Sequence, residues 1–289
     1  MKDLSGKVAV VTGGAGGIGR ALCDALVAEG AKVVVADLRA EDVEIAAHEL
    51  GDGAMGVVTD VSSWESVQAL ADATYAAYGA CHLLFNNAGV GEPSAKPWDT
   101  TLNDWRWLLG VNLMGVVHGV LAFVPRMIEG DEEGHIVNTS SGNGGISPIP
   151  TSSVYAVTKA GVTTYTECLA SQFESEATKL RASIFYPSGG LLKTGLWTSD
   201  RNRPDDLARE RPRSTEPMTV EKLEAQAEKG GYQLPWQDLD ALARDVIQGI
   251  KDERFIMMIG LESIGSTMRE RAAGFEQGEL PERKQGMLG

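Results

Sequence analysis

The first half of the chain alternates short apolar runs with longer segments in which apolar residues recur every three or four positions. The short runs are rich in β-branched residues and are typical of buried strands, whereas the longer spacing is typical of helices. Glycines or short polar clusters separate most of these segments. We predict strands at 7–12, 32–37, 56–60, 82–86, 135–140 and 181–186, and helices at 17–29, 41–50, 62–78, 102–128 and 153–177.

This alternation of strands and helices predicts a parallel sheet covered by helices on both faces. With right-handed crossovers it becomes a doubly wound, Rossmann-type α/β sheet. The apolar pattern weakens after Tyr186, and a helix at 239–250 and a strand at 254–259 then close the sheet. We therefore expect one domain over 1–289, in which 188–237 form a substrate lid inserted before the last helix–strand unit and 262–289 form a C-terminal extension.

The charge and cysteine pattern restrict the partners and the compartment. The chain has 26 Lys and Arg against 40 Asp and Glu, a net charge of −14, which argues against nucleic acid as a partner. It has no uninterrupted apolar run of about 18 residues, so we expect no membrane span. A polar N-terminus without a signal-peptide pattern, and three cysteines without a CxxC pair, favour the cytoplasm. No histidine has a metal-like partner at short spacing, so we predict no metal site.

A glycine-rich string joins the first predicted strand to the first predicted helix. In Thr12–Gly19 (TGGAGGIG), glycines permit a tight turn and let the backbone approach a phosphate. The free N–H groups of the helix that follows favour a negative ligand. The string therefore predicts a dinucleotide-binding loop formed by Gly13, Gly16, Gly17, Ile18 and Gly19.

An acid, Asp37, ends the next predicted strand. A carboxylate in this place can accept hydrogen bonds from both hydroxyls of the adenosine ribose, and it would repel the 2′-phosphate of NADP. The glycine string itself holds no Lys or Arg, although Arg39 is nearby. The pattern favours NAD over NADP, with a helix-capping role for Asp37 as the alternative.

Two polar groups carry candidate chemistry. Tyr155 and Lys159 share one face of the predicted helix 153–177, and an ammonium near a phenol favours the phenolate. Such a tyrosine can exchange a proton with an alcohol or carbonyl, but the same spacing also occurs on ordinary helix surfaces. Ser140 and Ser141 end the fifth strand, at the sheet edge where α/β proteins bind ligands, and either can hold a substrate oxygen or cap a turn.

Taken together, the motifs give the chain a resemblance to the single-domain short-chain dehydrogenase/reductase family. The matching marks are the TGxxxGxG string, Asp60-Val61 after the third strand and Asn86-Asn87-Ala88-Gly89 after the fourth. They continue in the family's order through Asn112, Ser141, Tyr155 and Lys159, and together they cover roughly residues 5–190.

The resemblance implies a role for each matching residue. Tyr155 would be the general acid/base, Lys159 would lower its pKa and hold the nicotinamide ribose, Ser141 would orient the substrate oxygen, and Asn112 would hold a water on a proton path. The cofactor would also be contacted by Leu38, Asp60, Val61, Asn87, Ala88 and Gly89. The implied activity is NAD-dependent interconversion of a secondary alcohol and a ketone. The family's contact helices, here starting near 102 and 153, imply a homodimer or homotetramer.

The chain departs from the family pattern at two places. Ser141 precedes Tyr155 by 14 positions, one more than usual, so Ser140 remains a weaker candidate. After the sixth strand Pro187 matches the family, but the glycine is displaced to Gly189 and the threonine to Thr194. We still expect these three residues to contact the cofactor.

The predicted lid is rich in aromatic and aliphatic residues, which suit a bulky apolar or aromatic substrate or else anchor the lid. These residues are Leu191, Leu192, Leu196, Trp197, Tyr232, Leu234 and Trp236. Its arginines, at 201, 203, 209, 211 and 213, are expected to pair with acids of the lid itself, Asp200, Asp205, Asp206 and Glu210, on a solvated face. An anionic substrate is the alternative.

Other functions remain compatible with the sequence. An NADP-dependent carbonyl reductase would have the same hydride-transfer chemistry with a different cofactor. A non-catalytic nucleotide-binding protein would share the fold but have no activity. An extended nucleotide-sugar epimerase is disfavoured, because its glycine string would read TGxxGxxG.

Overall fold

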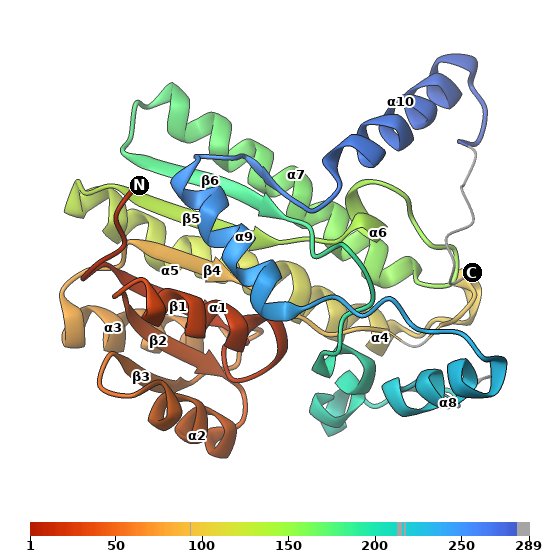
Figure 1. Ribbon diagram of the computed structural model, residues 1–289, viewed down its shortest axis with the longest axis horizontal. Helices are drawn as coiled ribbons and strands as arrows, with labels where there is room; N and C mark the ends of the chain where they lie inside the picture. The colour runs from red at the N-terminus through yellow and green to blue at the C-terminus, as the bar shows by residue number, and fades with distance from the viewer. Residues whose placement is uncertain (93, 213–215, 217, 282–289) are drawn as a thin grey trace.

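A seven-stranded, wholly parallel sheet forms the centre of the protein, in a computed structural model that describes residues 1–92, 94–212, 216 and 218–281 (Figure 1). The strand order is β3-β2-β1-β4-β5-β6-β7. The strands are β1 (Val8–Thr12), β2 (Lys32–Asp37), β3 (Ala54–Val58), β4 (Leu83–Asn86), β5 (Gly134–Thr139), β6 (Leu180–Phe185) and β7 (Ile256–Met257). The doubly wound fold predicted from the sequence is confirmed, and the order reverses between β1 and β4.

Helices cover both faces of the sheet, and the alternating side chains of each strand divide between two cores. In β1, Val11 packs with α1 and α9, whereas its neighbour Val10 packs with α3 and α5 on the opposite face. The helices are α1 (Gly17–Ala28), α2 (Ala40–Leu50), α3 (Trp64–Tyr78), α4 (Leu102–Leu108), α5 (Gly115–Gly130), α6 (Gly142–Gly145), α7 (Ser153–Ser175), α8 (Val220–Gly230), α9 (Leu239–Lys251) and α10 (Leu261–Gln277).

The long helix predicted at 102–128 is interrupted in the structure. A π-helical turn, η2 (Leu109–Met114), joins α4 to α5 and holds the buried Asn112. Helices with π-turns often carry functional groups at the turn, because the wider turn re-aims a side chain. By length and composition alone, Leu102–Gly130 is apolar enough to cross a membrane, but 56% of its most apolar stretch is buried inside the protein. A core helix has the same property.

The inserted segment 188–237, called the lid below, lies beyond the carboxyl ends of the strands (Figure 1). It contains the 3₁₀ segments η3 (Gly195–Asn202) and η4 (Asp205–Leu207), followed by α8. A bridge between Leu191 and Trp236 ties the start of the lid to its end. Of the C-terminal extension, α10 extends away from the sheet in Figure 1, and 282–289 lie outside the described residues.

Candidate active site

A cavity of about 990 Å³ opens at the carboxyl ends of the strands. Its lining joins the glycine loop, the ends of β2, β4 and β5, the first turns of α7 and the lid. Nearly all residues predicted from the sequence to be catalytic or to bind the cofactor line this one cavity. The exceptions are Asn112, which lies behind it, and Gly189, which faces Gln237 and Ile259 instead.

The glycine loop is shaped to leave its backbone open to the cavity. Gly13 has a positive φ of 65°, and a Cβ there would lie 2.9 Å from Ala88 Cα. A Cβ on Gly19 would lie 2.0 Å from the Gly13 carbonyl oxygen, so any side chain would push α1 off the loop. Among the described residues, no atom lies within 4 Å of a Cβ position on Gly16, the N-cap of α1. The residues from Gly16 to Gly19 line the cavity, so the N-terminus of α1 borders the space that a bound pyrophosphate needs.

Thr12, whose part the sequence did not reveal, ties β1 to the loop after β4. Its buried hydroxyl accepts hydrogen bonds from the backbone N–H groups of Asn87 (2.9 Å) and Ala88 (3.1 Å). The Asn87 side chain in turn donates to the Thr12 carbonyl oxygen at 3.0 Å. These hydrogen bonds hold the glycine loop after β1 and the loop after β4 at a fixed spacing, at the point where the strand order reverses. Gly89 follows Ala88 in the second of these loops.

Asp37 lies at the end of β2, against the glycine loop. Its carboxylate accepts hydrogen bonds from the backbone N–H groups of Ala15 (3.1 Å) and Leu38 (2.7 Å). Arg39 forms an ion pair with Asp42. The cavity wall near Asp37 therefore presents a carboxylate, while the nearby arginine is already engaged.

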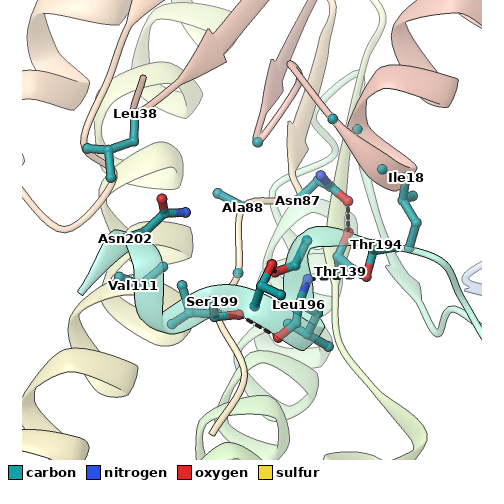
Figure 2. A pocket seen from close by; sticks show the side chains of 18 of the residues that line it. Ile18, Leu38, Asn87, Ala88, Val111, Thr139, Thr194, Leu196, Ser199 and Asn202 are labelled. Carbon is teal, nitrogen blue, oxygen red and sulfur yellow. Dashed lines mark hydrogen bonds between the residues drawn. The ribbon is translucent and has the colours of Figure 1, made fainter. Parts of the chain in front are cut away.

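Leu38, Asp60 and Val61 line the part of the cavity beyond Asp37. The Asp60 carboxylate accepts hydrogen bonds from the N–H (2.9 Å) and hydroxyl (2.7 Å) of Ser62, which fixes the turn after β3. Val61 is buried, and its carbonyl oxygen lies 2.9 Å from His118 Nδ1 of α5. Val111 of the π-turn lines the same cavity, as Figure 2 shows beside Leu38.

Tyr155 and Lys159 project from the first turns of α7 to the same region of the cavity. Lys159 Nζ donates a 2.8 Å hydrogen bond to the Thr139 carbonyl at the end of β5, and lies 5.8 Å from the centre of the Tyr155 ring. Burial lowers the pKa of Lys159 to about 8. Burial raises the pKa of the Tyr155 phenol, and the nearby Ser141 hydroxyl opposes that rise in part. Desolvation is thus the largest influence on the Tyr155 pKa, and the lowering by Lys159 stays a prediction.

The two serines after β5 have different surroundings. The Ser140 hydroxyl is buried and engaged, since it donates to the Lys159 carbonyl at 2.8 Å and lies 2.8 Å from the Thr163 hydroxyl. Ser141 is the N-cap of α6, and its side chain is the one that interacts with the Tyr155 phenol. The geometry thus favours Ser141 as the serine available to a substrate oxygen.

Asn112 is wholly buried in the π-turn, where it joins two loops of the site. Its side chain accepts from the Val90 N–H (2.8 Å) and donates to the Val90 carbonyl (2.9 Å). A Cβ on Gly89 would lie 3.4 Å from Asn112 Oδ1 and 3.5 Å from Lys159 Nζ, so both polar groups flank that glycine. Asn112 is thus close to Lys159 without lining the main cavity.

The lid crosses the mouth of the cavity. Figure 2 shows η3 running from Asn202, near Leu38, to Thr194, near Ile18. Thr194 lies against Gly17 of the glycine loop, and Ser199 accepts a 2.9 Å hydrogen bond from the Gly91 N–H. Pro187 and four of the predicted apolar lid residues line the cavity, namely Leu191, Leu192, Leu196 and Trp197. Tyr232, Leu234 and Trp236 do not, and Lys193 lies over the Trp236 ring.

The lid arginines do not all pair as predicted. Arg203 and Arg209 form ion pairs with Asp104 of α4, at 2.7 and 3.1 Å, and their side chains are 7% and 13% exposed. Arg203 also lies over the Trp107 ring. The expectation of a solvated face paired with lid acids is therefore wrong for these two residues, because a buried carboxylate on another element attracts them. Arg213 lies outside the described residues.

Comparison with known proteins decides the family. The family model of the short chain dehydrogenases matches residues 7–204. The chain belongs to the short-chain dehydrogenase family. The resemblance seen in the sequence is confirmed, and the protein is a nicotinamide-nucleotide-dependent oxidoreductase that acts on CH–OH groups.

Relatives within the short-chain dehydrogenase family differ in how much of the chain they match. A C alpha-dehydrogenase of Sphingobium sp. (strain NBRC 103272 / SYK-6) is 46% identical over 147 residues, which are 49% of this chain and 47% of that protein. The chain thus spans about half the length of that relative. An uncharacterized oxidoreductase of Staphylococcus aureus (strain MW2) is 34% identical over 72% of this chain and 90% of its own length.

Solved short-chain dehydrogenases include both cofactor types. A short chain dehydrogenase/reductase from Burkholderia phymatum, in complex with NAD, has a TM-score of 0.85 and 34% identity, and covers 99% of this chain and 100% of that one. A metagenomic short-chain oxidoreductase in complex with NADP has a TM-score of 0.60 and 33% identity, and covers 64% of this chain and 83% of that one. The choice between the two nucleotides must be argued from this chain's own residues.

Proposed function

We propose that the protein is an NAD-dependent dehydrogenase that interconverts a secondary alcohol and a ketone, with Tyr155 as its acid/base. The observation that carries this proposal is the convergence of Tyr155, Ser141 and Lys159 in the cavity that also contains the glycine loop. A proton-transfer group and a dinucleotide site in one cavity are what carbonyl–alcohol chemistry needs.

The residues that would hold the cofactor fit a dinucleotide. The open Cβ position of Gly16 and the N-terminus of α1 suit the pyrophosphate, and Val61 and Val111, which line the same cavity, suit the adenine. Lys159, whose ammonium lies near Gly89, would donate to the nicotinamide ribose. The nicotinamide, when bound, supplies or accepts the hydride.

The chain's own part in the reaction is proton handling and orientation. In the oxidation direction, the Tyr155 oxygen would accept the alcohol proton, and in the reduction direction it would return one to the ketone oxygen. Ser141 would donate a hydrogen bond to the same substrate oxygen. Lys159, beside the phenol, favours its ionised form, and Asn112 would support the proton path behind Lys159.

Two observations support NAD over NADP. The Asp37 carboxylate faces the cavity where the adenosine ribose of a Rossmann cofactor lies, and it would repel a 2′-phosphate. Arg39, the nearby cation, is paired with Asp42. The wild-type enzyme should therefore show a higher kcat/KM with NAD than with NADP.

For the substrate, we propose a bulky apolar or aromatic alcohol or ketone. The lid lines the cavity with Leu191, Leu196 and Trp197, and α4 adds Trp107. Such a lining binds apolar groups, with only a few polar groups to orient the ligand. The likeness to a protein named C alpha-dehydrogenase fits an alcohol-oxidising role. We also propose that the protein acts in the cytoplasm, without a nucleic-acid or membrane partner.

The Tyr155→Phe variant tests the acid/base assignment. A substrate is first identified by screening aryl and alkyl secondary alcohols by nicotinamide absorbance. With that substrate, the kcat of the variant should be about 10²–10⁴-fold lower than that of the wild type, while its affinity for NAD is retained. Tyr186→Phe is a matched control, because that buried phenol lies 3.0 Å from the Thr163 hydroxyl and does not line the cavity. Full turnover by Tyr155→Phe would exclude this tyrosine as the acid/base.

A further inference from the structure

The loop after β4 contacts three different elements through successive residues. Val90 exchanges two hydrogen bonds with Asn112 of the π-turn, and Gly91 donates to Ser199 of the lid. Glu92 comes next, and its carboxylate accepts a hydrogen bond from the Val154 N–H at the start of α7, at 3.1 Å. The loop that begins at the proposed cofactor contacts therefore ends on the helix that carries the proposed acid/base.

Helix α7 has no side-chain cap of its own. Its N-cap, Ser152, makes no capping hydrogen bond, and its first turn contains no acidic residue. The Glu92 carboxylate takes this place from 62 residues away, since it interacts with the backbone N–H groups of Val154 and Tyr155 and with the Ser152 side chain. One of the capped N–H groups thus belongs to Tyr155 itself.

We propose that Glu92 is a positioning residue that holds the first turn of α7, and with it the Tyr155 phenol, at a fixed place relative to the cofactor loop. This inference rests on the proposed function, because it takes Tyr155 as the acid/base. Glu92 does not line the cavity, so its effect would pass through the α7 backbone rather than through contact with substrate.

The charge on Glu92 gives this role a pH dependence. Burial raises the pKa of the Glu92 carboxyl to about 7, and the Asp104 carboxylate of α4 adds to the rise, while the α7 N–H groups and Ser152 oppose it. Arg203 and Arg209 of the lid pair with Asp104, and Tyr155 of α7 lies in the turn whose N–H groups donate to Glu92. The ionised carboxylate is the stronger acceptor for the helix N-terminus, so the better-positioned form is favoured above about pH 7.

Two variants of Glu92 separate positioning from stability. Glu92→Ala removes the cap, and a displaced Tyr155 should lower kcat by about 10–100-fold, with the KM for NAD changed less than about twofold. Glu92→Gln keeps a neutral acceptor oxygen, as protonated Glu92 does, and should recover only part of the lost kcat. Asp238→Ala is the matched control: Asp238 caps α9 through the Asp240 and Ala241 N–H groups, away from Tyr155. It should lower Tm by a few degrees, as any lost cap does, and leave kcat unchanged.

Two further readouts complete the test, and the first of them, hydrogen exchange, is independent of turnover and of the proposed function. Hydrogen exchange of the first α7 amides should speed up in Glu92→Ala and not in Asp238→Ala. The kcat profile of the wild type should contain a step near pH 7 that Glu92→Gln lacks. Unchanged exchange, or an unchanged profile in Glu92→Gln, would overturn the inference. Retained turnover in Tyr155→Phe would instead overturn the proposed function and leave the exchange result standing.

Discussion

At the scale of single residues, the proposed site contains a buried ammonium group, that of Lys159, whose charged form is disfavoured by its burial. Lys159 is 3% exposed, and burial lowers its pKa to about 8 from an ordinary 10.5. Because the folded pKa is depressed, the protonated form costs stability below about pH 8, and the cost disappears as the pH rises toward the unfolded value. The lysine is therefore retained at the expense of stability, as functional groups often are.

Lys159→Met should accordingly stabilise the protein while removing its activity. We expect the free energy of unfolding at pH 7 to rise by about 1–2 kcal/mol, because the buried charge is lost and only the bond to the Thr139 carbonyl is given up. Turnover should fall by at least about 10²-fold. Urea unfolding from pH 7 to 10 measures the first effect, and the gain over wild type should shrink with rising pH. A less stable variant at pH 7 would contradict the argument.

The residues of the site differ in how far the sequence could predict them. Those within one motif, such as the glycine loop or Tyr155 with Lys159, were foreseeable because their spacing alone brings them to one face or turn. The preference for Ser141 over Ser140 came only from the family pattern, and the structure adds a physical reason, since the Ser140 hydroxyl donates to the Lys159 carbonyl. Glu92 was not foreseen, because nothing local indicates a cap for a helix 62 residues away.

At the scale of elements, strand positions were predicted within about two residues, because every buried parallel strand must be apolar along its length. The two-residue β7 is the exception, shorter than the predicted 254–259 since only part of that run pairs with β6. The π-turn at 109–114 leaves no signature in hydrophobic spacing. The seating of the lid depends on Asp104 and Arg203, which are 99 residues apart in the chain.

This buried ion pair predicts how the lid responds to mutation. Arg203→Met leaves Asp104 buried with Arg209 as its remaining cation, and removal of one partner from a buried network costs about 3–5 kcal/mol at most. The lid should loosen over the cavity, so the KM values for NAD and substrate should rise together. Lys222→Met, which breaks the exposed pair with Glu216 in the same lid, should change stability by less than about 1 kcal/mol. Chemical denaturation and steady-state kinetics compare the two. If Arg203→Met and Lys222→Met changed stability and the KM values equally, the buried ion pair would not hold the lid in place.

At the scale of the whole molecule, each of the two proposed subunit-contact helices exposes an apolar side chain. Leu121 of α5 is 54% exposed and Val157 of α7 is 50% exposed. We expect light scattering to report a dimer or tetramer of the 30.8 kDa chain, and Leu121→Glu to shift it toward monomer. Ile45→Glu, at a similarly exposed site on α2, should leave the assembly unchanged. A monomeric wild type would contradict the prediction.

The preference for NAD or NADP can also be measured by how much each nucleotide raises the Tm of the protein. A ligand at 100 times its Kd that binds only the folded state adds about 2.7 kcal/mol to the free energy of unfolding, enough to raise Tm by several degrees. Because Asp37 faces the cavity and Arg39 is engaged by Asp42, NAD and NADH should raise Tm more than NADP and NADPH at equal concentration. Asp37→Ser should narrow that difference, because the charge that repels a 2′-phosphate is gone. It should also weaken NAD binding, because Asp37 accepts a hydrogen bond from the Ala15 N–H and, as proposed, would accept hydrogen bonds from the ribose hydroxyls. A larger shift with NADP in the wild type would show that Asp37 does not select the cofactor.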